Sequence, residues 1–328
     1  MRILLVTQYW YPENGVPQRR WSWLAKILID AGHEVCVVAP PPRNSRSIDD
    51  ATGDSSLTRK VPYKGAEGET IFRSSAYRVG DSITSKAASQ LLIALSQVRT
   101  LIKNRKQIEP DLVIGTVPAL PTAGVTWLAA KIFGRPYVID LRDAWPDLMG
   151  QATSWNAGVG DPSIREKLAK NGPLQLVTRV STKVLNSLLR GARAVLVTSS
   201  TLKASLESRR ELSTRGASPE VVVIRNVFPV ASQPTGDRGS HRKSGHLNVL
   251  YAGTIGRAQN LQNALEAAKL AKQQGLQVHM IFVGAGAARE LLQEKAQEFG
   301  VDARFIRLKP AELLNAYYDW ADTALVHL

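Results

Sequence analysis

Five residues in the last quarter of the chain have the types and the spacing of an anion-binding site. They fall in two turns that each follow a short apolar stretch, and they are Gly253, Gly256, Arg257, Gly284 and Gly286. Glycine lets backbone N–H groups approach an anion closely, and the N-terminus of a following helix favours negative charge. We therefore expect these turns to hold phosphate, with Arg257 as the counter-charge. The alternative is that the glycines only tighten the turns and that Arg257 is a solvated charge.

A second loop of this kind lies near the N-terminus, after the apolar stretch 2–7. It contains Glu13, Asn14 and Gly15 and leads into a segment with helical apolar spacing. A nicotinamide-dependent dehydrogenase would carry G-x-G-x-x-G here and an acidic residue at the end of the next strand. The loop has one glycine, and the next strand ends at Ala39 before three prolines. The sequence therefore does not have the dehydrogenase fingerprint.

A polar segment with one tryptophan follows the strand expected at Tyr137–Leu141. It reads RDAWPD and places Arg142, Asp143 and Trp145 at the carboxyl end of that strand. Loops at this end of α/β sheets often carry function. We expect Arg142 or Asp143 to face a substrate. The alternative is a structural ion pair between the two, with Trp145 as a packing anchor.

Strands and helices alternate along the chain, which predicts an α/β fold with doubly wound parallel sheets. Strands are expected at 2–7, Glu34–Ala39, Thr70–Arg73, Leu112–Thr116, Tyr137–Leu141, 194–198, 221–224, 249–251, Val278–Val283, 304–308 and 323–326. The segment 231–246 is polar and rich in Ser and Gly, which is the composition of a linker. The predicted domains are therefore residues 1–230 and 247–328.

Composition narrows the class of protein. The 328 residues include 42 basic and 28 acidic ones, so the net charge is +14 and an anionic partner or surface is expected. The sequence contains no run of eighteen apolar residues, which is about the length that a membrane-spanning helix needs. The single cysteine, Cys36, excludes a disulfide within the chain and fits a reducing cytoplasm. The five histidines show no metal-ligand spacing, and no nucleic-acid motif is present.

The positive charge gathers in two segments with helical apolar spacing. Residues 82–108 contain no acidic residue, and residues 163–193 contain seven basic residues and one acidic one. In the first segment one stripe is formed by Ala87, Leu91, Leu95, Val98 and Ile102. Basic amphipathic helices can lie on anionic membranes. The alternative is that each stripe packs on its own domain and the basic face is solvated.

Taken together, these segments resemble glycosyltransferase family 4, which comprises retaining enzymes of the GT-B fold. The likeness covers nearly the whole chain and is carried by QYWYPENGVPQRRWSWLAKIL, YVIDLRDAWPDL, VIRNVF, LNVLYAGTIGRAQNLQNALEAA, FVGAGAARELLQEKA and FIRLKPAELLNAYYDWADTALVHL. YVIDLRDAWPDL is similar to a segment of the subset that builds bacterial surface polysaccharides. The resemblance implies two Rossmann-like domains that face each other across a cleft.

The resemblance also implies roles for the residues singled out above. The donor would be a nucleotide diphosphate sugar, bound by Gly15, Gly253, Gly256, Arg257, Gly284 and Gly286 without metal or cofactor. Arg142 and Asp143 would be catalytic. The acceptor would be a lipid-linked or polysaccharide glycan at the cytoplasmic face of the membrane, contacted by Glu13, Asn14 and Trp145.

The sequence departs from the family pattern in three places. Val227 stands where the family usually has glycine, and Arg257 is the only basic residue in a turn that often carries a lysine as well. The E-x7-E segment, whose acidic residues contact the donor, would fall after residue 328. We therefore expect the second domain to be incomplete and the chain to be a fragment. A truncated form that binds without turnover is one alternative function, and a nucleotide-sugar 2-epimerase of the same fold is another.

Overall fold

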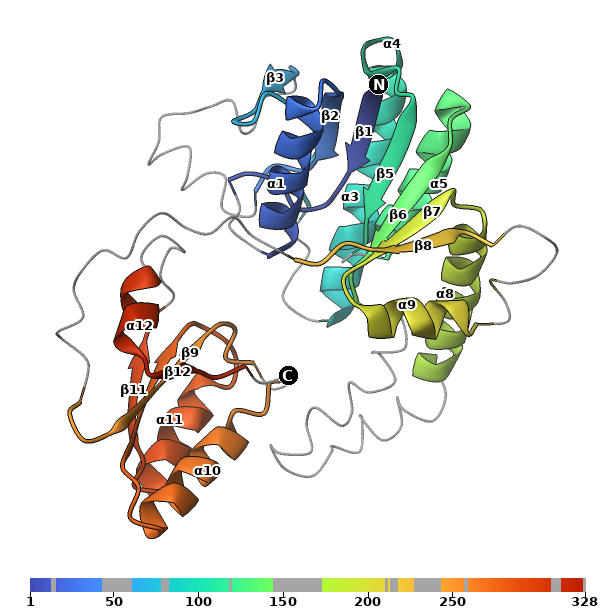
Figure 1. Cartoon of the computed structure of the whole chain (residues 1–328). Coiled ribbons are helices and arrows are strands. Elements are labelled where there is room, and N and C mark those ends of the chain that lie inside the picture. Colours follow the sequence, from blue (N-terminus) through green and yellow to red (C-terminus); the bar gives the residue numbers. More distant parts are fainter. Residues whose placement is uncertain are drawn as a thin grey trace. The chain divides into compact units, whose positions relative to one another are not determined.

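The computed structural model describes residues 1–12, 16–42, 61–77, 83–117, 120–143, 173–209, 212, 218–226, 243–256, 259–307 and 314–326. Their contacts form two compact units. The first contains the described residues up to 226, apart from Pro173, and the second contains those from 243 onward. Figure 1 shows that each unit has its own sheet and its own helices.

The first unit is built on an eight-stranded sheet with the order β3-β4-β2-β1-β5-β6-β7-β8. Its strands are β1 (Arg2–Val6), β2 (Glu34–Ala39), β3 (Tyr63–Lys64), β4 (Thr70–Arg73), β5 (Leu112–Thr116), β6 (Tyr137–Leu141), β7 (Ala194–Val197) and β8 (Glu220–Val223). All neighbours are parallel except β3 and β4, which are antiparallel. The predicted parallel sheet is therefore confirmed, with one antiparallel strand added at its edge. That strand was not predicted, because the two residues of β3 are too few to give a sequence pattern.

Helices cover both faces of this sheet (Figure 1). On one face α1 (Val16–Asp30) packs through Trp21 and Ala25. On the other face lie α3 (Ile83–Lys103), α5 (Pro121–Phe133), α8 (Pro173–Arg190) and α9 (Ser200–Glu207), which bury the largest apolar cluster of the described residues. The short helix α4 (Arg105–Ile108) follows α3.

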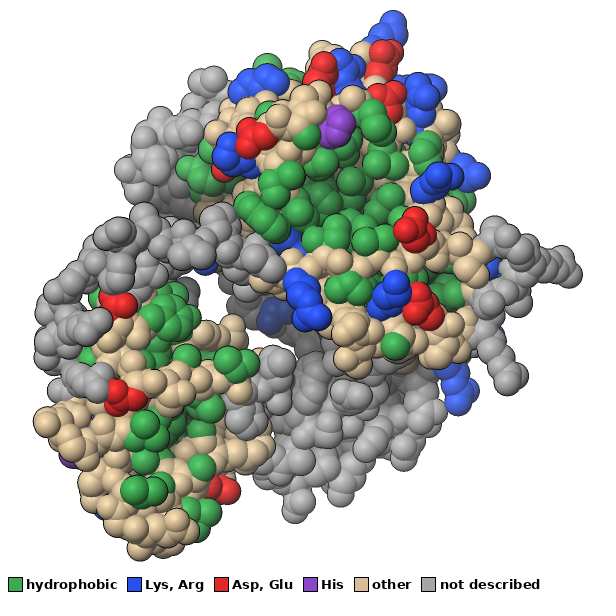
Figure 2. All heavy atoms as spheres, viewed as in Figure 1, with side chains coloured by type: hydrophobic (Ala, Val, Ile, Leu, Met, Phe, Trp, Pro, Cys, Tyr) green, Lys and Arg blue, Asp and Glu red, His purple; other side chains and the backbone are tan. Residues whose placement is uncertain are grey.

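The face that carries α1 is only partly covered beyond that helix by the described elements. Leu112, Ala194 and Leu196 on this side are half-buried and pack against the core around Trp21. In Figure 2, hydrophobic side chains gather on this face beside α1, where Figure 1 places β5, β6 and β7. The apolar surface of the sheet is therefore accessible there.

Most of the apolar stripe predicted on the first basic segment does not face the core, and only Val98 of that stripe is half-buried and packs against it. On α3 the residues that point inward are Ala94, Gln97 and Leu101, and Leu101 is 0% exposed. Leu95, in the predicted stripe, is 63% exposed, and Leu91 and Ile102 are exposed as well. The helix is apolar on two sides, and the sheet buries the side that the spacing alone did not single out.

The second basic segment has the same character where the structure describes it. On α8 the inward residues are Leu185 and Leu189, which are buried against the sheet. Leu176, Val180 and Val184 form a stripe at helical spacing and are exposed. Two helices of the first unit therefore present exposed apolar stripes beside basic residues.

The second unit contains a four-stranded parallel sheet with the order β11-β10-β9-β12. Its elements are β9 (Leu247–Ala252), α10 (Gln262–Gln273), β10 (Val278–Val283), α11 (Arg289–Glu298), β11 (Asp302–Ile306), α12 (Asn315–Trp320) and β12 (Thr323–Ala324). The strand predicted at 304–308 begins two residues earlier, where Asp302 contacts Lys243 and His279. Lys243 also donates its backbone N–H to Asn248 Oδ1 (3.0 Å), so the second unit begins before Leu247.

Local signals explain where several helices begin and end. Pro121 opens α5, where its missing N–H costs nothing, and Gly134 closes it in the left-handed conformation with φ of 64°. Ser199 caps α9, because its side chain accepts a hydrogen bond from the Leu202 N–H (3.1 Å). Within the described ranges, no helix is both long and apolar enough to cross a membrane.

Candidate functional site

The carboxyl ends of the parallel strands of the first unit meet at one edge of the sheet and carry the predicted substrate-facing residues. Arg142 and Asp143 directly follow β6, which lies between β5 and β7. The Thr198 hydroxyl, at the end of β7, donates to the Arg142 carbonyl oxygen (3.1 Å) and fixes the start of this segment. Asp143 is exposed and Arg142 is half-buried. Trp145 lies outside the described residues.

The Arg142 side chain has an unused donor. Its Nε atom is buried and has no hydrogen-bond partner among the described residues. Burial lowers the pKa of the Arg142 guanidinium, and the carboxylates of Asp140 and Asp143 oppose that shift. A guanidinium stays protonated at neutral pH despite such a shift. Arg142 can therefore supply a positive charge and an N–H donor to an anion at this edge.

A buried polar network lies behind the Arg142 segment. Asp140 accepts hydrogen bonds at both carboxylate oxygens, from Arg20 Nη2 (3.1 Å) and from Trp21 Nε1 (2.7 Å). The side chains of Arg20 and Asp140 are both fully buried. Arg20 and Trp21 belong to α1, so this network fixes α1 to the end of β6.

The chain that leads into the predicted loop at Glu13, Asn14 and Gly15 is anchored to β4 and to the residue just before that strand. Trp10 Nε1 donates to the buried carboxylate of Glu69 (3.1 Å). Arg73, at the end of β4, donates to the carbonyl oxygens of Tyr11 (2.5 Å) and Pro40 (2.9 Å). The predicted residues Glu13, Asn14 and Gly15 lie outside the described residues. The stretch before them is held by these contacts, and α1 after them is held by the bonds of Arg20 and Trp21 to Asp140.

In the second unit the two glycine turns pack against each other. Gly253 N–H donates to Val283 O (3.0 Å), and Ile255 N–H donates to Ala285 O (3.0 Å). A β-carbon on Gly284 would lie 1.9 Å from the carbonyl oxygen of Gly253. One on Gly286 would lie 2.1 Å from the carbonyl oxygen of Ile255. Both glycines are therefore needed for the close approach of the two turns.

The structure brings four of the predicted donor-binding residues together at one end of the second sheet. Gly253 and Gly256 lie in the turn after β9, and Gly284 and Gly286 lie in the turn after β10. A β-carbon on Gly256 would meet the side chain of Gln259, which can move aside, so packing does not require glycine there. Arg257 lies outside the described residues.

Arg289 is a residue at this end of the sheet that sequence reasoning missed. It is the first residue of α11, and its Nη1 donates to the carbonyl oxygens of Gly284 (2.9 Å) and Ile306 (3.1 Å). Its Nη2 donates to Phe305 O (3.2 Å). These contacts fix the turn after β10 against the end of β11. The sequence signal that could have predicted this role is a basic residue at a helix start, five positions after the glycine of the turn.

Among the described residues, no group of three or more His, Cys, Asp or Glu side chains is placed to hold a metal ion. The buried His279 lies at the opposite end of β10 from the glycine turns, with its Nδ1 atom 2.9 Å from Asp302 Oδ2. Burial lowers the pKa of His279, and Asp302 opposes that shift. Along β10 this pair is remote from the glycine turns.

Comparison with known proteins identifies the class of enzyme. Residues 15–227, more than half of the chain, match the family model described as a glycosyl transferase 4-like domain. A relative from Escherichia coli (strain K12), named as the colanic acid biosynthesis glycosyl transferase WcaI, is 28% identical over 99% of this chain and 76% of its own length.

Solved structures agree in fold. Sucrose-phosphate synthase from Thermosynechococcus elongatus superposes with a TM-score of 0.65 at 15% identity, covering 99% of this chain and 75% of its own. HepE from Anabaena, solved in complex with UDP, gives a TM-score of 0.55 at 15% identity, covering 99% and 73%. The family match agrees with the two α/β units and with the expected glycine turns. The chain therefore belongs to the glycosyl transferase 4-like family and is a glycosyltransferase with the GT-B fold.

Proposed function

We propose that this glycosyltransferase moves a sugar, with retention of configuration, from a nucleotide diphosphate sugar to a lipid-linked or polysaccharide acceptor of the bacterial cell surface. The observation that carries the donor part is the pair of packed glycine turns at the carboxyl end of the second sheet. Their close backbone approach fixes the two turns ahead of the N-termini of α10 and α11, and a helix N-terminus favours phosphate. The name of the Escherichia coli relative supports the proposal of a surface-glycan acceptor. The UDP in the HepE structure makes UDP the first nucleotide to test.

The chemistry needs positive charge at the diphosphate. When the bond between the sugar carbon and the diphosphate oxygen breaks, the diphosphate takes the electron pair and the sugar ring becomes cationic. The acceptor oxygen then bonds to that carbon, and its proton passes to the departing diphosphate oxygen. Preorganised donors at the departing oxygens stabilise this transition state. We assign that role to Arg257, Gly15 and the turns at Gly256 and Gly284, and we propose that no metal takes part.

At the edge of the first sheet, we propose that Arg142 and Asp143 contact the reacting sugar. Arg142 offers a half-buried guanidinium, and Asp143 offers an exposed carboxylate close to it in the chain. A carboxylate beside a cationic sugar ring stabilises it through charge. Glu13, Asn14 and Trp145 are assigned to the acceptor side on the basis of the family resemblance.

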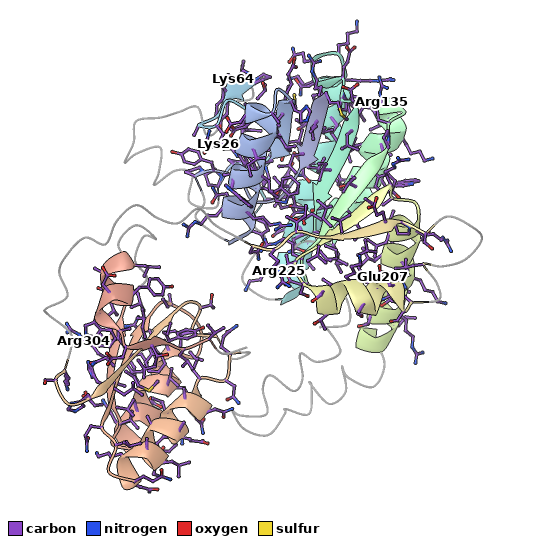
Figure 3. All side chains as sticks on the ribbon, in the orientation of Figure 1. Lys26, Lys64, Arg135, Glu207, Arg225 and Arg304 are labelled. Atoms are coloured by element: carbon purple, nitrogen blue, oxygen red, sulfur yellow. The ribbon has the colours of Figure 1, made fainter. Side chains whose placement is uncertain are left out.

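Titration calorimetry of the 328-residue chain with UDP, GDP and their sugars, without metal, tests the donor assignment. We expect micromolar binding of one nucleotide series. Arg257→Ala should weaken that binding at least tenfold, because it removes a charge at the diphosphate. The matched control is Arg304→Ala on β11, whose side chain is exposed and extends outward from the second unit in Figure 3. Binding that is equal for both variants, or absent in a folded wild-type chain, would contradict the assignment.

We also propose that the enzyme works on the cytoplasmic face of an anionic membrane, held there by α3 and α8. Support comes from the exposed apolar stripes on both helices, which lie beside the exposed basic residues Arg99, Lys103, Arg179 and Lys183. An apolar stripe flanked by lysine and arginine is the pattern of a helix that lies in a lipid interface. Each basic residue near an anionic surface contributes about 1 kcal/mol.

Co-sedimentation with vesicles tests the membrane proposal. We expect binding to vesicles that contain phosphatidylglycerol, weaker binding at high salt, and little binding to phosphatidylcholine alone. The variant Leu91→Glu/Leu95→Glu should abolish it. The matched control is Leu270→Glu on α10, because Leu270 is 58% exposed, much like Leu91 at 57%, but lies in the second unit. Equal sedimentation of all three proteins would refute a role for α3.

A further inference from the structure

The buried Arg20 side chain reaches a third segment besides α1 and β6. Its Nη1 donates to Ile224 O (2.8 Å), to Arg225 O (3.2 Å) and to Asn226 Oδ1 (3.1 Å). These three residues directly follow β8 and are the last described residues of the first unit. Arg225 is labelled at this position in Figure 3. One guanidinium therefore joins the start of α1, the end of β6 and the point where the chain leaves the first unit.

A gain in folding stability does not explain why the ion pair of Arg20 and Asp140 is buried. Removing two charges from water costs several kcal/mol per ion, and a buried ion pair often contributes no more than an apolar replacement of similar volume. Arg20 and Asp140 are nevertheless both at 0% side-chain exposure, with both Asp140 oxygens and both Arg20 Nη atoms hydrogen-bonded. What the pair supplies is a fixed geometry among three segments: α1, which contains Arg20, and two segments that lie 120 and 204 residues from Arg20 in sequence.

Each of the three segments leads to a residue of the candidate site. Asp140 is two positions before Arg142. Arg20 lies in the second turn of α1, shortly after the predicted loop at Gly15. Residues 224–226 begin the connection to the second unit, where the donor turns lie.

We infer that Arg20 and Asp140 are positioning residues: they lock the exit segment 224–226 and the segment 142–143 into one geometry and thereby set the rate of sugar transfer. The inference rests on the proposed transferase function for its effect on rate. The mechanical link within the first unit does not depend on that function. A misplacement of about 1 Å in a reacting assembly can cost roughly a hundredfold in rate.

The test uses Arg20→Lys in the full chain. A lysine can keep the ion pair with Asp140, but a single ammonium lacks the fork that reaches Asp140 and residues 224–226 at once. The matched control is Arg209→Lys, since Arg209 also bonds to an asparagine side chain of the first unit, Asn186 (3.2 Å), but does not belong to the network.

The first readout is hydrogen–deuterium exchange. We expect Arg20→Lys to raise exchange by at least tenfold at both 141–143 and 223–226, with β2 unchanged, and Arg209→Lys to leave both segments as in the wild type. Uniform acceleration in all strands, or a change at only one of the two segments, would overturn the inference. If Arg20→Lys does not fold, Asn226→Ala replaces it, because Asn226 is exposed and contributes one of the three acceptors.

The second readout is turnover of the donor that calorimetry identifies, followed as nucleotide diphosphate release. We expect kcat to fall ten- to hundredfold in Arg20→Lys, with the donor KM within threefold of wild type. Loss of thermal stability with an unchanged kcat would mean that the pair is only structural. A wild-type chain that releases no diphosphate would count against the proposed function, while the exchange data would still decide the link between the two segments.

Discussion

Replacing Gly284 with alanine tests whether the second unit needs its two glycine turns to touch. Gly284 is not among the described residues with a positive φ, so alanine brings no backbone strain of its own. The effect comes from contact alone. The new β-carbon would lie 1.9 Å from Gly253 O, and real contacts of this kind essentially never fall below 3.0 Å. The turns must therefore separate by at least about 1.1 Å.

The size of the effect follows from what that separation breaks. The bonds from Gly253 N–H to Val283 O and from Ile255 N–H to Ala285 O are both 3.0 Å long and would be lost. Each such bond contributes about 0.5–1.5 kcal/mol net. Overpacking a well-packed region costs about 1–3 kcal/mol more. The free energy of unfolding of the second unit should therefore fall by about 2–6 kcal/mol, a large part of the total stability of a typical domain.

The assay is hydrogen exchange of β9 and β10 in increasing urea, together with calorimetric titration with UDP. We expect Gly284→Ala to lose stability as above and to bind UDP at least tenfold more weakly where it is still folded. The control is Gly275→Ala, which has a φ of +84° and no atom within 4 Å of its β-carbon. It adds left-handed strain of about 1–2 kcal/mol without contact and should keep its affinity. A Gly284→Ala protein within about 0.5 kcal/mol of wild-type stability would refute the reasoning.

Three further predictions concern the first unit. In urea melts, Leu101→Ala on α3 should lower the free energy of unfolding by about 2–5 kcal/mol, because Leu101 is buried. Leu95→Ala should lower it by less than about 0.5 kcal/mol, because Leu95 is exposed. Equal losses would contradict the orientation of α3. Gly124→Ala in α5 should raise that free energy by about 0.5–1 kcal/mol, since its β-carbon would meet nothing within 4 Å; a lower melting temperature would argue against it. Burial raises the pKa of Tyr137 to about 12 from an ordinary value of 10, and its hydroxyl donates to Leu188 O. Because the folded state binds this proton more tightly, the stability it contributes is complete below pH 10 and is lost as the pH rises to about 12; in pH-dependent melts Tyr137→Phe should show a smaller loss over that range.

The sequence predicted the elements that carry the site because buried parallel strands leave a strong local signal. The run from Val35 to Ala39 is continuously apolar, as expected for a strand covered on both faces. Glycines after such strands likewise mark the turns. The contacts of Arg20 and Arg289 could not be predicted in the same way. Each reads locally as a solvated helical charge, yet Arg20 is fully buried and its partners lie 120 to 206 residues away.

The direction of the stripe on α3 could not be read from spacing for a related reason. Apolar residues occupy two sides of that helix, and its sequence does not say which side meets the sheet. The choice depends on long-range contacts: Gln97 Nε2 donates to the carbonyl oxygen of Thr7 (2.6 Å), which fixes the helix face against the end of β1. Periodicity identifies a helix with apolar faces, and tertiary contacts decide which face is buried.

The central place of β1 in the first sheet has a consequence for how the protein is made. This strand leaves the ribosome before β5, which is one of its two neighbours and in which Leu112 pairs with Ile3. At the usual 5–20 residues per second, synthesis of the residues between them takes roughly 5 to 22 s. Throughout that time one edge of a strand that is apolar from Ile3 to Val6 stays open to other chains. The yield of folded enzyme in a cell should therefore depend on the speed of translation between β1 and β5, and on chaperones near the ribosome, as much as on the stability of the finished fold.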